Sequence, residues 1–496
     1  MSASPQLSIE SLPAWATLQD VKLQQVGMRH IDGKGYGLVA EGDLSASENL
    51  DDSLEIMRVP ADLVLSGAAV EEYAKVDHNF KQLMEAVGRK STRLDIMIYL
   101  LVHIVSGRHA GDKTRRCVSS PWSEYIKFLP RDIPVPTLWT ETHQLLLRGT
   151  SLEDALEAKV AALESEFDTL RDTSATLTFW NQLLWEADGA KLSDWLLVDA
   201  WYRSRCLELP HAGEAMVPAL DMVNHSGGGS AMAYYEEETG GDVSLRIRPG
   251  AHVPAGSEVT ISYGDSKSAA EMLFSYGFID TTTTKRQLTL RLNDFPDDPL
   301  ALAKRRVFGS AARVVTIRQG DGDTAPMWES GFVHLMCLNE EDGLEFRVLQ
   351  DDAGGRTLRL FWQEEDVTAR AHEFDTLLRD HPLAALFRLR AVTVVQERAA
   401  SQLEKLAAAP SGAQLEALVV AEVIDQAHVD LVGSLRDIEH SILQDAVAEF
   451  EEERSQLVEN ETVVAYLRSM EDGQNQPEQY DATAPADDGD NDDDFS

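Results

Sequence analysis

The spacing of apolar residues changes several times along the chain, and each change predicts a different kind of structure. Between residues 23 and 59, short apolar pieces are separated by Gly, Asp and Ser, which indicates β-strands joined by turns. From about residue 65 to 200, apolar positions recur every three or four residues, as in SLEDALEAKVAALESEFDTL, which is typical of helices. Short apolar runs punctuated by Gly and Pro return at 216–279, so strands are expected again.

Beyond Pro296 the helical spacing dominates once more, with a strand-like patch at 344–362. This order predicts an α+β fold in which a helical insertion splits a β-rich module, because regular βαβ alternation is absent from the pattern. The chain is accordingly divided into the first part of the β-rich module, a helical insert, the second part of the module, a separate mostly α-helical domain and an acidic tail. The predicted boundaries are 22–64, 65–200, 201–290, 291–470 and 471–496.

The composition is that of a soluble globular protein with more than one core. The chain has 496 residues, of which 43% are hydrophobic and 7% aromatic. Its longest apolar stretch, Ile96–Val105, contains Tyr99 and His103 and is much shorter than the ~20 residues of a membrane span, so it predicts a buried helix. The N-terminus lacks the features of a signal peptide, and three widely spaced cysteines indicate neither a disulfide framework nor a cysteine zinc cluster. We therefore expect a cytoplasmic or nuclear protein that is not secreted and has no membrane partner.

The net charge of the chain indicates which kinds of molecule it can bind. There are 84 acidic and 44 basic residues, giving a formal net charge of −40, which disfavours direct binding of nucleic acid and favours a basic partner. Part of this charge lies in the tail 471–496, where carboxylates occur without Lys or Arg. The tail is expected to be disordered and solvated, with the holding of basic substrates as the alternative.

Three short segments are candidates for chemistry. Gly33–Leu38 (GKGYGL) could let backbone approach a ligand closely or could be an ordinary turn, and it does not fit a Rossmann GxGxxG that opens a helix. Asn224 and His225 follow an apolar run and precede a Gly-rich loop. An Asn side chain has the donors and acceptor needed to clamp an amino acid. His225 could be a base, a metal ligand or a backbone donor, but no second His or Cys lies at metal-ligand spacing, so no metal is expected.

The third segment places Tyr263-Gly264 after a strand-like run, with Tyr276-Gly277-Phe278 thirteen positions further on. Such tyrosines are commonly packing residues with a satisfied hydroxyl group. The functional alternative is an aromatic channel.

In order and in spelling, these segments resemble the SET-domain methyltransferases of the Rubisco large subunit methyltransferase class. The shared pattern is a GxGL-type turn, D-x-x-N-H-S, a strand ending in Y-G, and Y-G-F. Segments 120–130 and 147–152 of the insert also look like that class. The resemblance covers about residues 22–290, and more weakly the C-terminal helical part, which would be the substrate-binding domain of the family.

The resemblance implies an S-adenosylmethionine-dependent protein-lysine N-methyltransferase that transfers a methyl group directly to a deprotonated lysine of another protein. It is expected to be a monomer with a basic substrate such as a ribosomal protein or a histone. Tyr263 falls on the catalytic position, which also contacts the cofactor. The remaining cofactor positions match Lys34, Gly35, Tyr36, Asn224 and His225. Substrate-side positions match Arg205, Asp221, Tyr276 and one of Tyr234 and Tyr235, of which we take Tyr235.

One departure from the family pattern leaves a question for the structure. Where family members usually have Ser-Asn-Ala, this chain has Ser268-Ala269-Ala270, so the amide side chain at position 269 is missing and the hydrogen bonding of that loop is in doubt. Two alternative functions also remain open. The chain could be a catalytically silent SET-like adaptor, or a protein-histidine methyltransferase, although the bulk of Tyr276 favours lysine.

Overall fold

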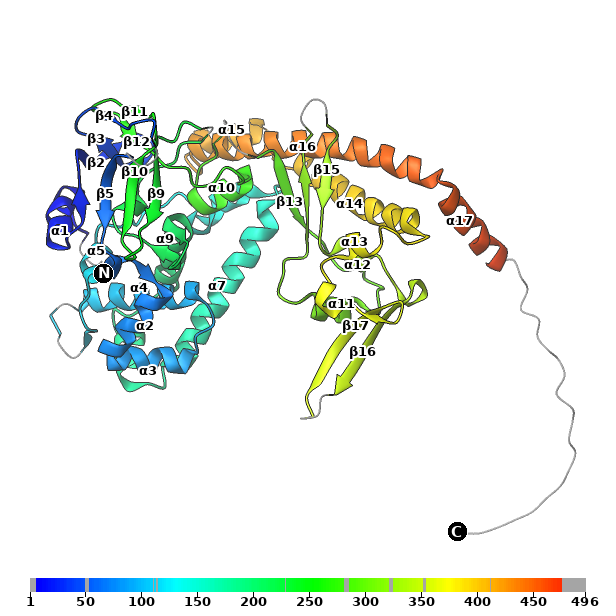
Figure 1. Cartoon of the computed structure of the whole chain (residues 1–496), viewed down its shortest axis with the longest axis horizontal. Helices are drawn as coiled ribbons and strands as arrows, with labels where there is room; N and C mark the ends of the chain where they lie inside the picture. Colours follow the sequence, from blue (N-terminus) through cyan, green and yellow to red (C-terminus); the bar gives the residue numbers. More distant parts are fainter. Residues whose placement is uncertain are drawn as a thin grey trace, which may run out of the picture. The chain divides into compact units, whose positions relative to one another are not determined.

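The structure is a computed structural model of the chain (Figure 1). It describes residues 6–49, 53–109, 111–112, 115–227, 229–280, 285–320, 324–350, 354–410 and 412–474. The chain forms two compact units. The first comprises Met1–Thr289, Ile317–Gln319 and Ser401–Gln444, and the second comprises Leu290–Thr316, Gly320–Ala400 and Asp445–Ser496.

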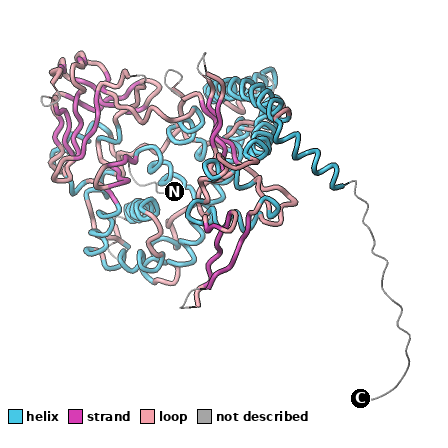
Figure 2. The backbone as a smooth tube through the Cα atoms, turned by 45° about the vertical axis from the view of Figure 1, so that its right-hand side comes forward, coloured by secondary structure: helices cyan, strands magenta, loops and turns pink. Residues whose placement is uncertain are grey.

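The strands of the first unit form small antiparallel sheets with the orders β1-β5-β10-β9, β12-β3-β2, β6-β8-β7 and β11-β4. Each sheet pairs a strand that precedes the helical insert with a strand that follows it, so the β-rich module is assembled from two distant parts of the chain. Figure 2 shows these strands gathered together in the unit. The bounds are β1 Lys22–Leu23, β2 Val26–Ile31, β3 Gly35–Ala40, β4 Leu44–Ser45, β5 Glu55–Val59, β6 Leu65–Ser66, β7 Cys206–Leu209, β8 Gly213–Met216, β9 Ala233–Glu237, β10 Val243–Ile247, β11 His252–Val253 and β12 Glu258–Val259.

The helices of the first unit lie mainly between β6 and β7. Helix α4 contains the apolar stretch 96–105, and every residue of that stretch is buried, as the sequence predicts. The predicted α+β class with a helical insertion is confirmed. The bounds are α1 Leu12–Leu18, α2 Gly67–Val76, α3 His78–Val87, α4 Thr92–Arg108, α5 Pro121–Tyr125, α6 Glu141–Gln144, α7 Leu152–Ser174, α8 Thr178–Trp180, α9 Leu192–Arg205, α10 Ala269–Tyr276 and α15 Gly412–Val420.

The chain after residue 286 contains more strand than the sequence pattern predicted. Two three-stranded sheets, β13-β14-β15 and β16-β17-β18, occur within or beside the segment expected to be mostly helical. The hairpin β16-β17 is the strand-like patch of the sequence, whereas adjacent Val314 and Val315 interrupt the alternation in β14 and β15 has only three residues. The strand bounds are β13 Gln287–Arg291, β14 Val314–Arg318, β15 Met327–Glu329, β16 Leu344–Gln350, β17 Arg356–Trp362 and β18 Glu365–Asp366.

The helices after residue 291 do not all belong to one unit. Residues Ser401–Gln444 pack with the first unit instead of forming one domain with the rest of 291–470. This segment contains the end of α14, all of α15 and the first part of α16. The bounds are α11 Ala301–Phe308, α12 Val333–Met336, α13 Phe374–Leu377, α14 Ala384–Ala407, α16 Gln426–Val458 and α17 Glu461–Gln474. The acidic tail was predicted for 471–496. Helix α17 ends at Gln474, and the rest of the predicted tail lies outside the described residues.

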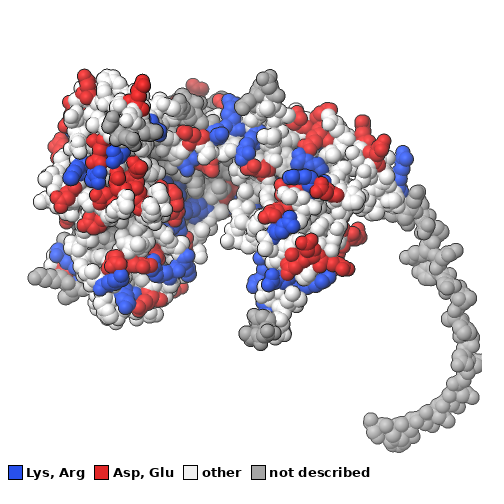
Figure 3. Space-filling view, in the orientation of Figure 1, with Lys and Arg blue, Asp and Glu red and all other residues white. Residues whose placement is uncertain are grey.

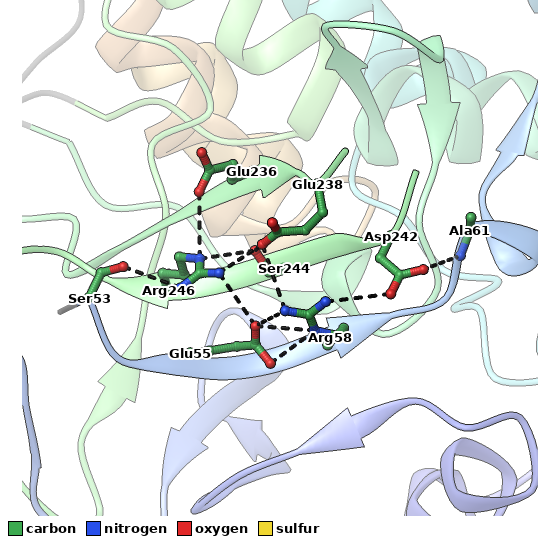
Figure 4. Close-up of polar contacts among 9 residues, drawn as sticks. All are labelled: Ser53, Glu55, Arg58, Ala61, Glu236, Glu238, Asp242, Ser244 and Arg246. Atoms are coloured by element: carbon green, nitrogen blue, oxygen red, sulfur yellow. Dashed lines mark hydrogen bonds and ion pairs between the residues drawn. The ribbon is translucent and has the colours of Figure 1, made fainter. Parts of the chain in front are cut away.

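The sheet that carries Tyr235 on β9 is bridged by a network of charged side chains (Figure 4). Arg246 on β10 lies 2.7 Å from Glu238 and 3.5 Å from Glu55 on β5, so it bridges the two parts of the chain. Asp242 also bridges the two parts, through Arg58 at 3.6 Å and the backbone amide of Ala61 at 3.1 Å. Strands from both sides of the insert are therefore joined by ion pairs as well as by backbone hydrogen bonds.

Three helices of the insert are joined by a fully buried carboxylate, Asp199 of α9. Its oxygens accept from Arg93 of α4 at 2.7 Å, from Lys159 of α7 at 2.8 Å and from Arg203 of α9 at 2.7 Å. Burial alone would raise the pKa of Asp199, but the three cations outweigh it and lower that pKa. Arg203 also donates to the carbonyl oxygen of Phe274 on α10, so the buried charge cluster positions α10.

We predict that Asp199→Asn destabilises the first unit by about 3–5 kcal/mol, because it removes a fully buried carboxylate from three partly buried cations, of which Arg93 keeps its pairing with Glu166. Chemical denaturation followed by fluorescence of the buried tryptophans measures this. Asp168→Asn is the matched control, since Asp168 pairs with Arg171 on the exposed face of α7 and its loss should cost under about 0.5 kcal/mol. Equal stabilities of the two variants would show that the buried cluster does not brace the insert.

Candidate functional site

The β2-β3 hairpin forms one wall of the site. Its turn contains Gly33 and Gly35 at φ values of 76° and 78°, a conformation that favours glycine, and a Cβ added at either position would meet nothing within 4 Å. Lys34, between them, places its Nζ 2.8 Å from Glu258 Oε2 of β12. Tyr36 is exposed on β3 with its ring edge-on to His30. The hairpin therefore presents open backbone and a single ammonium group.

Asn224 lies beside this hairpin. Its Nδ2 donates to Glu258 Oε1 at 2.8 Å, so Glu258 links the side chains of Asn224 and Lys34. Gly37 of β3 has no room for a side chain here, since a Cβ would come within 2.6 Å of Asn224 Nδ2 and 2.9 Å of Glu258 Oε1. Lys34 and Asn224, two of the residues predicted to hold a cofactor, thus bond the same carboxylate, which was not selected from the sequence.

His225 has a structural contact on each ring nitrogen. The backbone N–H of Tyr263 donates to His225 Nδ1 at 3.0 Å, which leaves the proton on Nε2, 3.3 Å from Asp280 Oδ2. A parallel bridge pairs His225 with Ile261, and the Ile261 amide donates to the Asn224 carbonyl oxygen at 3.0 Å. Of the roles left open for His225, that of a residue which holds the local backbone agrees with these contacts, because neither nitrogen is free to act as a base or ligand.

Tyr263 lies where this paired backbone meets an aromatic cluster. Its hydroxyl donates to the carbonyl oxygen of Val223 at 2.8 Å. Its ring centroid is 4.7 Å from that of Tyr276 and 5.1 Å from that of His225. Burial raises the pKa of Tyr276 to about 12 and also raises that of Tyr263, so both hydroxyls are neutral at physiological pH.

Asp221 and Arg205 form a buried polar pair beside the cluster. The Tyr125 hydroxyl donates to Asp221 Oδ1, and Arg205 Nη1 donates to the Asp221 carbonyl oxygen at 2.8 Å. Asp221 Oδ2 is 3.8 Å from the same guanidinium and has no hydrogen-bond partner, and Arg205 Nε has none either. Burial raises the pKa of Asp221 to about 6, although Arg205 acts to lower it.

A cavity of about 410 Å³ brings the substrate-side residues together. Its wall includes all four predicted substrate positions and Tyr263, whereas Tyr234, the alternative to Tyr235, is not part of it. The predicted cofactor residues other than Tyr263 do not line this cavity. The two groups meet at Tyr263, which bonds Val223 by its hydroxyl and His225 by its amide. The residues that line the cavity include Arg205, Glu208, Glu214, Asp221, Tyr235, Tyr263 and Tyr276.

Three residues that support this arrangement were not selected from the sequence. Glu258 bonds Asn224 and Lys34, Tyr125 bonds Asp221, and Asp280 contacts His225. Glu258 begins the run that leads to Tyr263, and Asp280 lies two residues after Phe278, so their positions next to the motifs offered a signal. Tyr125 had none, because its partner lies 96 residues away in the chain.

The structure answers the question raised by Ala269. Ser268 caps α10 in a capping box: its Oγ accepts from the Glu271 amide at 3.2 Å, and the Glu271 carboxylate accepts from the Ser268 amide at 2.6 Å. Ala269 itself is buried in an apolar cluster that includes Leu273 and Leu435. The helix start is therefore satisfied without an amide at position 269, and an Asn there would place a polar group among apolar side chains.

The raised pKa of Asp221 predicts a pH-dependent stability. Between its ordinary pKa near 3.9 and about 6, the folded protein binds more protons at Asp221 than the unfolded chain does. Asp221 therefore makes the protein less stable as pH rises through that range. Relative to wild type, Asp221→Asn should gain stability from pH 4 to pH 7, by at most about 3 kcal/mol, in denaturation curves.

Asp62→Asn, on the exposed surface of the same unit, is the control and should follow the wild-type pH profile. A constant difference between Asp221→Asn and wild type across this pH range would contradict the assignment.

Several known proteins are similar to this chain in sequence. No family model matches the chain. "SET domain-containing protein 8" of Schizosaccharomyces pombe is 24% identical over 387 residues, which are 77% of this chain and 82% of the relative. The chloroplastic "Ribulose-1,5 bisphosphate carboxylase/oxygenase large subunit N-methyltransferase" of Pisum sativum is 25% identical over 291 residues, 56% of this chain and about half (54%) of that protein's length.

The fold has a solved counterpart. The crystal structure of "the SET domain of LSMT bound to Lysine and AdoHcy" superposes with a TM-score of 0.62 at 20% identity, covering 91% of this chain and 93% of that one. Similarity of sequence to the fungal and pea proteins extends over most or half of the chain, and similarity of fold extends over nearly all of it. The chain is therefore a SET-domain protein with homology to the Rubisco large subunit methyltransferase.

Proposed function

We propose that the protein is an S-adenosylmethionine-dependent protein-lysine N-methyltransferase that acts on another protein. The observation that carries this proposal is the position of Tyr263, which lines the cavity while its backbone is bonded to His225 beside Asn224. One tyrosine thus joins the two groups of residues that methyl transfer requires. The pea relative is named as an N-methyltransferase, and the solved structure holds lysine and AdoHcy, which is what S-adenosylmethionine becomes after donating its methyl group.

The residues around Glu258 have the chemistry to hold the cofactor. Open backbone at Gly33 and Gly35 gives close access to a ligand, and Asn224 offers amide donors and an acceptor for an amino-acid group. The Glu258 carboxylate, now bonded to Lys34 and Asn224, is the anion available to a ligand's ammonium. When bound, the cofactor supplies an electrophilic methyl group on a sulfonium. Lys34, Gly35, Tyr36, Asn224 and His225 would hold it, and the His225 contacts keep Tyr263 in position.

The cavity suits the lysine. A free lysine with a pKa of about 10.4 is only about 0.04% neutral at pH 7, a deprotonation cost of roughly 4.6 kcal/mol. Tyr235, Tyr263 and Tyr276 line a partly enclosed space, and desolvation there lowers the pKa of an amine. Arg205 is a positive charge in the same wall and acts in the same direction, whereas the carboxylates Asp221, Glu208 and Glu214 act in the opposite direction. Desolvation by the three tyrosines, together with Arg205, is what favours the neutral amine that can attack a methyl group.

Tyr263 is then an orienting group and not a base. Because its hydroxyl hydrogen goes to the Val223 carbonyl, the oxygen lone pairs are free to accept an N–H of the amine. Its raised pKa keeps it neutral while it does so. An amine held by one N–H has its lone pair directed away from that bond, and such positioning is the main contribution an enzyme makes to an in-line transfer.

A basic substrate is supported by two carboxylates in the cavity wall. Glu208 of β7 and Glu214 of β8 lie directly opposite each other in the hairpin, and both are exposed and line the cavity. Like charges in this position repel each other and are relieved by a cation between them. We propose that a Lys or Arg near the target lysine binds there.

The distribution of charged side chains on the surface bears on the kind of partner the protein binds. On the face shown in Figure 3, Lys and Arg side chains of the described residues are interspersed with Asp and Glu. This distribution offers little to a nucleic-acid backbone and agrees with a protein substrate. Within the part of the chain that the structure describes, no helix combines the length and apolar character needed to cross a membrane. We propose a monomer that acts in the cytoplasm or nucleus.

Tyr263→Phe should lower turnover by at least about 100-fold with little change in cofactor affinity, because it removes only the hydroxyl that orients the amine. Asn224→Ala should weaken cofactor binding as well. Calorimetric titration with S-adenosylmethionine measures affinity, and transfer of tritiated methyl groups to an extract that lacks the protein's own activity measures turnover. Tyr234→Phe, outside the cavity, is the matched control.

Small and equal effects of the two site variants on rate would refute the enzymatic role. Wild-type protein that binds no S-adenosylmethionine would favour the adaptor hypothesis. Label found on histidine instead of lysine would favour the histidine alternative.

Replacing Glu208 and Glu214 by Gln should raise the KM for lysine peptides with a neighbouring Arg or Lys by roughly threefold to tenfold, with kcat unchanged. An array of lysine-centred peptides with basic, neutral or acidic neighbours provides the measurement. A Glu10→Gln/Glu72→Gln variant removes the same charge from exposed positions of the same unit and should leave the peptide preference unchanged. Loss of activity on all peptides alike would contradict a role in substrate selection.

A further inference from the structure

A second cluster of ionisable side chains lies in the first unit, away from the cavity. His143 of α6 places Nε2 3.1 Å from Asp425 Oδ2, and His428 of α16 places Nδ1 2.8 Å from the same oxygen. One ligand atom from each of the three residues lies within 4.8 Å of the others. They come from two segments separated by more than 280 residues, so the cluster is made by the fold.

Two of these side chains, His143 and Asp425, are also oriented by a second contact. Thr140 caps α6, and its Oγ1 is 2.6 Å from His143 Nδ1. Asp425 precedes α16, and its Oδ1 accepts from the backbone amide of His428 at 3.0 Å. Metal-binding His and carboxylate ligands are commonly held in this way by a hydroxyl or backbone group. Asp425 Oδ2 and the two ring nitrogens are left directed toward one another.

The tautomer of His143 decides what lies between its Nε2 and Asp425. If the Thr140 hydroxyl donates to Nδ1, then Nε2–H donates to the carboxylate and no further cation is needed. When Nδ1–H instead donates to Thr140, a neutral ring has its lone pair on Nε2, which faces a carboxylate oxygen at 3.1 Å. Two acceptors at that separation need a positive charge between them. A proton is one solution, and a metal ion that also engages His428 is the other.

The donor set favours a transition metal. Two imidazole nitrogens and one carboxylate oxygen suit Zn²⁺, whereas Ca²⁺ and Mg²⁺ prefer oxygen ligands. Ligand atoms about 2.1 Å from a tetrahedral ion are roughly 3.4 Å apart, so the present separations of 2.8 and 3.1 Å would open by a few tenths of an ångström. The Asp425 side chain is 53% exposed, which leaves a fourth position open to water.

We propose that His143, Asp425 and His428 bind one Zn²⁺ ion, with water as the fourth ligand, and that this ion fastens α6 of the insert to the start of α16. The proposal rests on this geometry and is independent of methyl transfer. The site is far from the motifs discussed above in sequence, and the ion would be structural.

The fastened segment supports the helix that carries Tyr276. Ile424, next to Asp425, packs in the same apolar cluster as Ala269 and Leu273 of α10. The ring of Trp139 contacts His428, with centroids 4.7 Å apart, and its Nε1 donates to the carbonyl oxygen of Pro134 at 2.9 Å.

Pro134 is in turn packed against the end of α10. A Cβ added at Gly277 would come within 2.5 Å of the Pro134 carbonyl oxygen. Contacts therefore run without a break from His428 to the residue after Tyr276, and an ion at the cluster would stiffen that wall of the cavity.

The test uses the full chain without an affinity tag, stripped of metal by a chelator and dialysed. Calorimetric titration with ZnCl₂ should show one ion per chain, and Zn²⁺ should raise the thermal midpoint. CoCl₂ should give the visible absorption of a four-coordinate ion. Asp425→Asn is the decisive variant, because Asn caps a helix as well as Asp does but offers no carboxylate. It should weaken Zn²⁺ binding by at least about 100-fold and abolish the cobalt spectrum.

His143→Gln should show the same losses from the other side of the cluster. His252→Gln is the matched control, since His252 is an exposed histidine of the same unit that contacts Ser45, and it should bind Zn²⁺ like wild type. Wild-type protein that binds no Zn²⁺ would show that a proton alone fills the cluster and would overturn the proposal. Binding that is unchanged in Asp425→Asn and His143→Gln would also overturn it, because the ion would then lie elsewhere.

Discussion

The backbone pairing between residues 224–226 and Ile261 is the interaction on which the site depends. Ile261 donates to the Asn224 carbonyl oxygen, and the Ser226 amide donates to the Ile261 carbonyl oxygen, each at 3.0 Å. His225 adds a third link by accepting the amide of Tyr263. These few bonds hold the segment with the polar side chains against the segment with the catalytic candidate. Without them, neither Asn224 nor Tyr263 would have a defined position relative to the other.

Several polar groups of the site are left without partners inside the protein. Asp221 Oδ2 and Arg205 Nε are buried and unbonded, although hydrogen bonds fully satisfy most buried polar atoms in folded proteins. Both residues belong to the cavity wall, so a bound ligand or ordered water can complete their bonds. The destabilisation that Asp221 brings at neutral pH follows from the same placement. The unpaired polar groups lower the stability of the protein at the place where a polar ligand is expected to bind, which is characteristic of binding sites.

The fold class and five residues of the cavity wall could be predicted because their signals are local or ordered along the chain, whereas Glu208 and Glu214 of the same wall were not selected. The buried helix around Ile96–Val105 shows in its composition, and Tyr263 and Tyr276 stand in recognisable motifs. The supporting contacts were not predictable, because Tyr125 and Asp221 meet only through tertiary packing. The same is true of residues 401–444, whose helical spacing is clear but whose packing with the first unit depends on apolar surfaces distant in sequence. Strand β14 was not recognised because its adjacent Val314 and Val315 interrupt a strict alternation of apolar and polar residues.

The departure at Ala269 and the position of α16 have one physical explanation. An amide at the start of α10 would need a polar partner, but in this chain Ile424 and Leu435 cover that face with apolar side chains. An alanine is then the compatible residue, and the capping box of Ser268 and Glu271 supplies the hydrogen bonds of the helix start. Because α10 ends at Tyr276, the helices that cover its first turn also set the position of the channel tyrosine. The C-terminal segment of the first unit is therefore part of the site's support, even though none of its residues lines the cavity.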